Sequence, residues 1–270
     1  MTEETLAFDK VQISFSGPLA RITLADPDRL NALTPAMAAG LTQALQEVAK
    51  PRRSVRAVLM TGEGRGFCAG VNLSGRADDA DKAANLPALS MVESLFHPLI
   101  RKFRDVEVPV IAAVNGPCVG IGLAMMLLSD YVVAAEDAFF LVPFRNLASA
   151  TDSGLSWLLP RAIGLARARQ MMLRAERVPA PLALDWGLVN EVVALSDLAA
   201  ASRRVADEFA HGPTVALGVM RRLWQESMTN SLDEHLELEA RSVARTSRTK
   251  DNLAALKVFG RKDKPTFVGA

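Results

Sequence analysis

Two apolar segments that run directly into glycine-rich loops are the features that most constrain the fold of this 270-residue chain. Residues 55–60 lead into MTGEGRGFCAGVN, and residues 108–114 lead into VNGPCVGIGLA. Short continuous apolar runs are typical of strands that are buried on both faces, as in a parallel sheet. A glycine loop followed by a helix start leaves backbone N–H groups unpaired at the strand end. Two such loops could present two N–H groups to one oxygen atom, which is an oxyanion hole.

The rest of the pattern predicts strands first and helices last. Residues 11–26 alternate as a hairpin around SGP, and Thr34 with Pro35 marks a helix start. The run YVVAAEDAFFLV predicts one strand or a pair, and a helix is expected over about 87–104. After about residue 165 the pattern is helical almost to the end, with four helices expected between 196 and 260. The sequence therefore predicts an α/β core over residues 1–200 and a helical region over residues 201–270.

Composition excludes several classes of function. The net charge is +1 and no basic block reaches five residues, so neither nucleic acid nor an anionic membrane is an expected partner. The amino terminus MTEETLAFDK has no apolar signal segment, and the longest apolar run is too short to span a bilayer. The cysteines and histidines show no metal-ligand spacing; they are Cys68, Cys118, His97, His211 and His235. We therefore expect a cytoplasmic protein without a metal site.

Binding of a dinucleotide is the main competing interpretation of the glycine loops. In GIGLAM the third position of the dinucleotide fingerprint is Met125, where glycine or alanine should allow close helix packing. The chain has no GxxxxGK[ST] phosphate loop and no G-x-S-x-G nucleophile turn. A nucleotide-binding function is therefore not favoured.

Five segments, in order and spacing, resemble the crotonase superfamily, which includes the enoyl-CoA hydratases and isomerases. They are DRLNALT, MTGEGRGFCAGVNL, PVIAAVNGPCVGIGLAMMLLSD, WLLPRAIG and ALDWGLVNEVV. The resemblance covers about residues 10 to 265. It implies an α/β crotonase fold of repeated ββα units with a helical C-terminal trimerisation region. It also implies an acyl-CoA substrate, no cofactor apart from the coenzyme A of that substrate, and a homotrimer or homohexamer.

The same resemblance implies four contacts with the acyl-CoA. The family's two oxyanion donors are backbone N–H groups that correspond here to Val71 and Ile121. The carbonyl that meets the CoA adenine corresponds to Ala69, and the basic residue on the phosphate side corresponds to Arg29.

Two departures from the hydratase pattern, together with one carboxylate, suggest a different reaction. Where hydratases carry catalytic glutamates this chain has Ala124 and Phe144, and neither can transfer a proton. Asp152 is the one acid in the apolar segment 139–164, where a helix cap or loop position is the ordinary explanation. Its place resembles that of the catalytic aspartate of dienoyl-CoA isomerases, ring-epoxide isomerases and 4-chlorobenzoyl-CoA dehalogenases, and SGLSWLLPR is most similar to the ring-epoxide isomerases. We therefore expect Asp152 to move a proton in an isomerisation that passes through an enolate.

Three alternatives remain open at this stage. One is an enoyl-CoA hydratase of fatty acid β-oxidation with a non-standard acid such as Glu93. Another is an aryl-CoA dehalogenase that uses Asp152 as nucleophile with His97. The third is a catalytically silent acyl-CoA binder. The acyl group is not identified, because the variable segment 74–96 and the C-terminal helices that would shape its pocket carry no signature.

Overall fold

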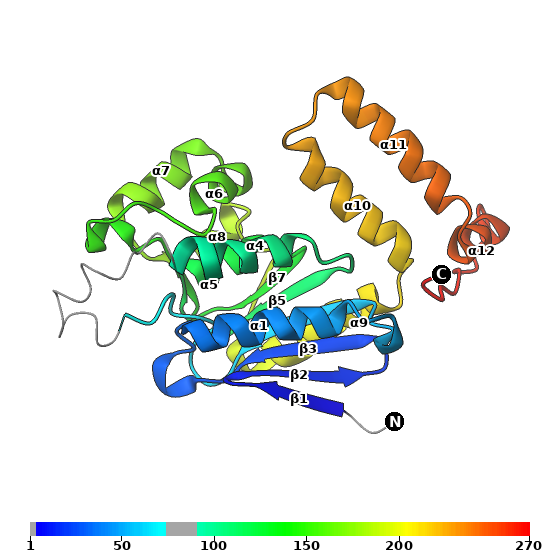
Figure 1. Cartoon of the computed structure of the whole chain (residues 1–270). Coiled ribbons are helices and arrows are strands. Elements are labelled where there is room, and N and C mark those ends of the chain that lie inside the picture. Colours follow the sequence, from blue (N-terminus) through cyan, green and yellow to red (C-terminus); the bar gives the residue numbers. More distant parts are fainter. Residues whose placement is uncertain (1–3, 74–90) are drawn as a thin grey trace.

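The computed structural model describes residues 4–73 and 91–270, which form an α/β fold around a seven-stranded sheet (Figure 1). The first three strands are antiparallel neighbours, and from β3 onward the strands run parallel. In their order across the sheet they are β1 (Glu4–Phe8), β2 (Val11–Ser16), β3 (Leu19–Leu24), β4 (Ala57–Gly62), β5 (Val110–Val114), β7 (Tyr131–Ala135) and β10 (Glu191–Val193). Every residue of β4 and β5 is buried, which confirms that the two apolar segments form neighbouring interior strands.

The sheet is wider than the sequence pattern predicted. Strand β1 extends the predicted hairpin by pairing with β2, and β10 adds a parallel edge beside β7. The expectation of helix almost throughout after residue 165 is wrong at β10 and at the short strand β9 (Val178–Pro179). These strands are only two or three residues long, so they show no alternation, and their pairing with distant strands defines them.

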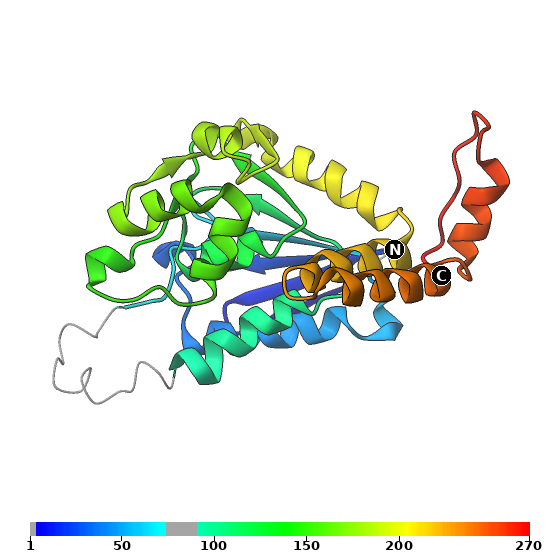
Figure 2. The same cartoon turned by 90° about the horizontal axis from the view of Figure 1, so that it is seen from above.

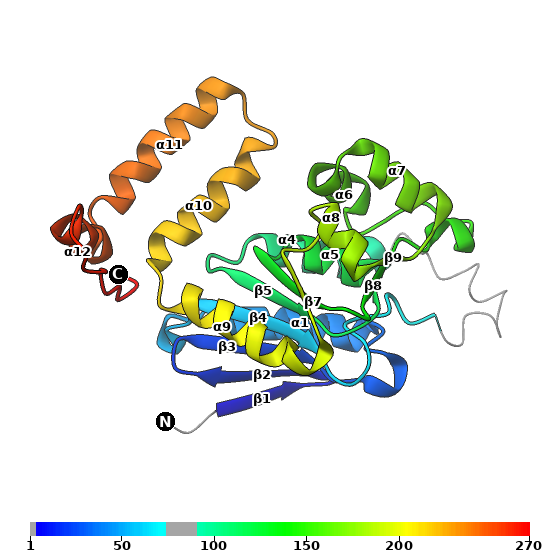
Figure 3. The ribbon, with the colours of Figure 1, turned by 180° about the vertical axis from the view of Figure 1, so that it is seen from behind.

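Helices cover both faces of the sheet. Helix α1 (Pro35–Val48) packs against β1 and β2, whereas α9 (Leu198–Ala210) packs against β4, β5 and β7 on the opposite face (Figures 1 and 3). Thr34 caps α1 as predicted, because its side chain accepts a hydrogen bond from the Met37 N–H at 3.1 Å.

A second layer of the body contains a small sheet and several helices. The small sheet pairs β6 (Cys118–Val119), β8 (Phe139–Leu141) and β9, so YVVAAEDAFFLV contains two strands that belong to different sheets. The helices of this layer are α4 (His97–Arg104), α5 (Ile121–Leu127), α6 (Leu155–Ile163), α7 (Leu165–Arg174) and α8 (Ala180–Asp185). A π-helical turn, η3 (Val92–Phe96), precedes α4, and the part of the predicted helix before residue 91 lies outside the described residues.

The C-terminal helices project away from this body (Figures 1 and 2). They are α10 (Thr214–Ser227), α11 (Leu232–Thr246) and α12 (Lys250–Val258), and together with α9 they confirm the four helices predicted between 196 and 260. Helix α9 crosses residue 200 and packs on the sheet, so the projecting part begins after α9. The boundary at residue 200 remains a prediction. No helix in the described part of the chain is long and apolar enough to cross a membrane.

Candidate active site

The two glycine loops, which follow β4 and β5, are in direct contact. Cys68 and Cys118 form a parallel bridge, and the Val119 N–H donates to the Cys68 carbonyl at 2.9 Å. A Cβ on Gly120, where φ is +53°, would lie 3.9 Å from the Gly70 Cα. The peptides that precede Val71 and Ile121 are therefore neighbours, although they lie far apart in the sequence.

The N–H groups of Val71 and Ile121 are both available for a ligand. Val71 bridges to Leu33 through its flanking peptides: the Leu33 N–H donates to Gly70 and the Asn72 N–H donates to Leu33. In a parallel bridge of this kind, the N–H of Val71 itself points away from Leu33. Ile121 is the first residue of α5, where N–H groups have no partner within the helix. Within residues 4–73 and 91–270, neither N–H donates a backbone hydrogen bond.

Asp152 lies in the loop before α6, and it does not cap that helix. The N-cap position belongs to Gly154, and no side chain bonds there. The Asp152 carboxylate instead accepts a hydrogen bond from the Ser153 hydroxyl at 2.9 Å. The helix-cap half of the ordinary explanation is therefore wrong, whereas the loop position that it also allowed is what the structure shows. Partial burial raises the pKa of the Asp152 carboxyl, while the Ser153 hydrogen bond and the positive charge of His97 lower it by smaller amounts.

His97 and Glu93 are placed very differently with respect to Asp152. His97 is half-buried at the start of α4, close enough for its charge to act on Asp152. Glu93 is exposed on the π-helical turn, and among the described residues it is not one of the groups that shift the pKa of Asp152. The structure therefore associates His97, and not Glu93, with the carboxylate.

Ala69 and Arg29 lie on neighbouring segments beside the first glycine loop. The Ala69 N–H donates to the Leu30 carbonyl at 3.0 Å, which joins the segment carrying Arg29 to that loop. The Ala69 carbonyl accepts no hydrogen bond from any residue in the described ranges. Arg29 is exposed, with its guanidinium 3.7 Å from Asp26. Its side chain is therefore free to reach an anion.

Comparison with known proteins decides the family. The family model for enoyl-CoA hydratase/isomerase matches residues 14–270, which is nearly the whole chain. The chain belongs to the enoyl-CoA hydratase/isomerase family. Its fold is the crotonase fold: the enoyl-CoA hydratase of Polaromonas sp. JS666 matches with a TM-score of 0.87 and 31% identity, over 96% of this chain and 99% of that one.

Relatives in this family carry different names. The 1,2-epoxyphenylacetyl-CoA isomerase of Escherichia coli K12 is 36% identical over 92% of this chain and 94% of its own. A protein of Rhodobacter capsulatus named probable enoyl-CoA hydratase is 34% identical over 98% of this chain and 100% of its own. A 4-chlorobenzoyl coenzyme A dehalogenase of Arthrobacter is 30% identical over 86% of this chain and 84% of its own. Family membership alone therefore does not identify which of these reactions the chain catalyses. The residues of the active site have to distinguish them.

The two positions that the resemblance aligns with the hydratase glutamates hold buried apolar side chains. Ala124 is fully buried within α5, and Phe144 begins the short helix η4 (Phe144–Leu147). Burial also raises the pKa of the Cys68 thiol to about 11, so this thiol is not a ready nucleophile. No cluster of potential metal ligands occurs among the described residues.

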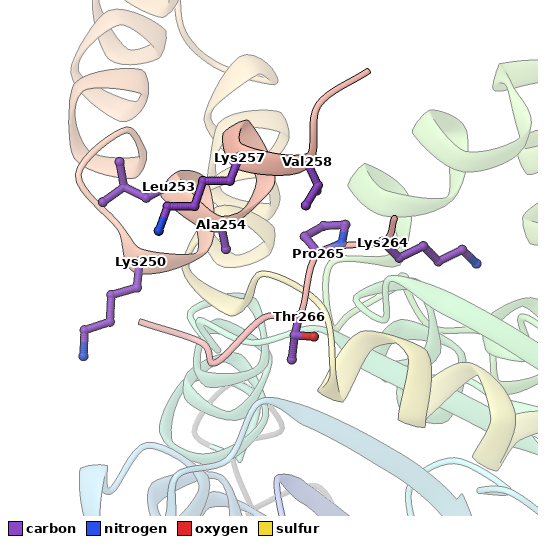
Figure 4. Close-up of a pocket in the computed structure, with 8 residues that line it drawn as sticks. All are labelled: Lys250, Leu253, Ala254, Lys257, Val258, Lys264, Pro265 and Thr266. Atoms are coloured by element: carbon purple, nitrogen blue, oxygen red, sulfur yellow. The ribbon is translucent and has the colours of Figure 1, made fainter. Parts of the chain in front are cut away.

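Two pockets among the described residues lie in the C-terminal region, and Asp152 lines neither of them. One, of about 490 Å³, is lined by Lys250, Leu253, Ala254, Lys257, Val258, Lys264, Pro265 and Thr266 (Figure 4). The other lies on α10 and α11. The segment expected to shape the acyl pocket, 74–96, falls mostly outside the described residues.

Two asparagines that the sequence analysis did not single out hold the first glycine loop. The fully buried Asn31 amide donates to the carbonyls of Glu63 and Gly66 at 2.9 and 2.7 Å. Its oxygen accepts from the Asp26 N–H at 2.8 Å. Asn115, from the second loop, donates to Gly64 at 2.8 Å. Both residues lie within the quoted motifs, but Asn115 precedes Gly116, and an Asn-Gly pair in a loop is ordinarily only a turn signal. A single asparagine in a loop, such as Asn31, carries no stronger signal.

Replacing Asn31 with alanine should destabilise the first loop. The change leaves the buried Asp26 N–H without its acceptor and removes the donor to the Glu63 carbonyl, whereas Gly66 keeps a hydrogen bond from Asn115 at 3.2 Å. We therefore expect a loss of about 1–3 kcal/mol in the free energy of unfolding. Chemical denaturation of the variant and of the exposed control Asn146→Ala would measure it. A loss no larger than that of the control would show that Asn31 does not support the loop.

Proposed function

We propose that the protein is an isomerase that shifts a double bond, or opens a strained ring, in an acyl-CoA through a thioester enolate. The single observation that carries the proposal is the environment of Asp152. This half-buried carboxylate has a raised pKa and no helix-capping role, while Ala124 and Phe144 replace both hydratase glutamates. Hydration requires groups that activate water and protonate carbon, whereas isomerisation requires one group that takes a proton and returns it.

In the proposed mechanism, the thioester oxygen accepts hydrogen bonds from the Val71 and Ile121 N–H groups. Asp152 removes a proton from one carbon, and the C–H electron pair passes into the enolate. Each well-placed donor stabilises that enolate by about 3–4 kcal/mol. The double bond then re-forms at a new position as Asp152 returns the proton to another carbon. No water enters, and the carboxylate is regenerated.

The proposal also assigns the coenzyme A part of the substrate. The Ala69 carbonyl would accept a hydrogen bond from the adenine, and Arg29 would pair with a phosphate. Among the residues that the structure describes, neither group has a competing strong contact apart from the long Arg29–Asp26 ion pair. We further propose that no separate cofactor takes part and that the protein acts in the cytoplasm.

The test is a side-by-side assay of the wild-type protein with three CoA esters. We expect turnover of a 3-enoyl-CoA or of 1,2-epoxyphenylacetyl-CoA by isomerisation, and at most trace hydration of crotonyl-CoA. Hydration faster than either isomerisation would overturn the proposal. Binding of all three esters without turnover of any would indicate a silent acyl-CoA binder.

The proximity of His97 to Asp152 favours one second candidate, an aryl-CoA dehalogenase. Asp152 would attack the ring carbon, chloride would leave, and water activated by His97 would hydrolyse the resulting ester. Chloride release from 4-chlorobenzoyl-CoA, added as a fourth ester in the same assay, would support this reaction over isomerisation.

We propose a homotrimer or homohexamer, supported by the apolar surface of the projecting helices. Leu236 and Val243 lie seven residues apart on α11, 52% and 66% exposed. Light scattering should give three or six times 29.0 kDa for the wild type, and a smaller mass for the double variant Leu236→Lys/Val243→Lys. Arg245→Glu, half a turn away on the same helix, is the control and should keep the wild-type mass. An unchanged mass in the double variant would contradict this role for the α11 face.

A further inference from the structure

Ser153 lies beside Asp152 with its side chain completely inside the protein. It is one of few polar residues in the buried set, and its hydroxyl donates to Oδ1 of Asp152 at 2.9 Å. No other hydrogen bond to the Asp152 carboxylate is present in the described part of the chain. The orientation of the carboxylate therefore depends on this single hydroxyl.

The backbone at Ser153 is in a conformation that residues other than glycine rarely adopt. Its φ is +54°, and the next residue, Gly154, has a φ of +78°. The left-handed conformation costs a serine about 1 kcal/mol or more relative to ordinary backbone. Glycine would be the natural residue for turning the chain into α6. A strained serine in that place is consistent with a use for its hydroxyl.

We infer that Ser153 is a positioning residue that holds Oδ1 of Asp152, so that Oδ2 alone takes up and returns the proton. This inference rests on the proposed isomerase function. A carboxylate with one oxygen committed to a hydroxyl donor has a fixed plane and one free basic oxygen. A shuttle needs that geometry, because the same oxygen must reach both carbon atoms without rotation of the carboxylate.

The hydroxyl also tunes the basicity of the carboxylate. A hydrogen bond donated to the ionised form favours that form, and the Ser153 hydroxyl therefore lowers a pKa that burial raises. The other charged group that acts on Asp152 is His97, from α4. Ser153 exerts this effect through a hydrogen bond, whereas His97 acts through its charge.

Two variants distinguish the effect of the Ser153 hydroxyl on activity from the effect of the backbone strain at this residue. Ser153→Ala removes the hydroxyl and keeps a side chain at a positive φ, whereas Ser153→Gly removes the hydroxyl and relieves the strain. In both we expect kcat for isomerisation to fall by about tenfold, with KM changed by less than about threefold. The acid limb of the pH dependence of kcat/KM should move up by about one unit. Ser149→Ala, at an exposed serine of the same loop, should match the wild type.

Two results would overturn the inference. One is an acid limb that stays at the wild-type pH in both hydroxyl-free variants. The other is a Ser153→Gly variant with normal kcat, because the enzyme would then work without the Ser153 hydroxyl.

If the wild-type protein shows no isomerisation, the proposed function is refuted. A second measurement, which needs no turnover, then tests whether the Ser153 hydroxyl acts on the Asp152 carboxylate. This readout is the ¹³C NMR titration of the Asp152 carboxyl, identified by its absence in Asp152→Asn. An upward shift of the titration midpoint in Ser153→Ala supports the contact between hydroxyl and carboxylate. Equal midpoints in Ser153→Ala and wild type exclude it.

Discussion

Replacing Asp152 with asparagine should lower the rate of isomerisation by about 10²–10⁴-fold, while the affinity for the CoA ester stays within a few-fold of wild type. Asparagine has nearly the same shape but cannot accept and return a proton. The proposed oxyanion donors and CoA contacts lie in other parts of the chain, so binding should persist. Stopped-flow turnover and equilibrium titration with a non-reactive acyl-CoA would measure the two quantities. Asp137→Asn, at an exposed acid nearby in the sequence, is the control. Isomerisation that survives in Asp152→Asn would show that another group carries the proton.

Because the pKa of Asp152 is raised, Asp152→Asn should also change the thermal stability of the protein. Because burial raises the folded-state pKa above the ordinary value of 3.8, the folded protein holds this proton more tightly than the unfolded chain does. The resulting stabilisation is complete at pH values below the pKa that Asp152 has in the unfolded chain. It is lost as the pH rises through the pKa that Asp152 has in the folded protein. At pH 7 the ionised carboxylate therefore costs stability, and Asp152→Asn should raise Tm by about 1–2 °C after allowance for solvent screening. That gain should shrink as the pH approaches 4, and a lower Tm at pH 7 would contradict the explanation.

The second large effect is expected at Arg221, which anchors the projecting helices to the body. Arg221 is 2% exposed, and its Nε donates to both carboxylate oxygens of Asp130 at 2.9 and 2.8 Å. Its other nitrogens donate to the Arg104 and Leu128 carbonyls, each at 2.8 Å. Asp130 also accepts a hydrogen bond from the Val110 N–H at 2.7 Å. One side chain of α10 thus joins the end of α4, the end of α5 and the start of β5.

Arg221→Met should lower the free energy of unfolding by about 3–5 kcal/mol, because it leaves the Asp130 carboxylate buried without its counter-charge. For a chain of this length the change corresponds to a Tm lower by roughly 10 °C. Arg222→Met is a matched control, because Arg222 is the next residue on the helix but its side chain is exposed. Its ion pair with Glu226 is long, at 4.0 Å. Replacing both partners, as Asp130→Leu/Arg221→Met, should recover part of the loss. A single variant as stable as the control would show that the ion pair does not anchor α10.

Much of the site could be predicted from the sequence where the signal is local. The apolar segments before both glycine loops define buried parallel strands, and parallel strands end at the same edge of a sheet. The approach of Val71 and Ile121 follows from that topology. Asp152 stood out because a carboxylate in an apolar segment needs a reason to be there. The assignment of its role remains a prediction that the Asp152→Asn assay tests.

Other features were decided only by the tertiary structure. Strand β10 exists because three residues pair with β7, and a three-residue segment has too little periodicity to be distinguished from helix. The asparagines Asn31 and Asn115 gain their importance from carbonyls more than thirty residues away in sequence.

For the site, the sequence by itself determined which amino-acid types are present and where the strands end. It did not determine the distances between those residues. The bond between Ser153 and Asp152 depends on two successive positive φ angles, and the influence of His97 on Asp152 depends on how α4 packs. Local sequence determines burial and backbone preference, whereas the contacts between separate segments are determined by the packing of the whole chain.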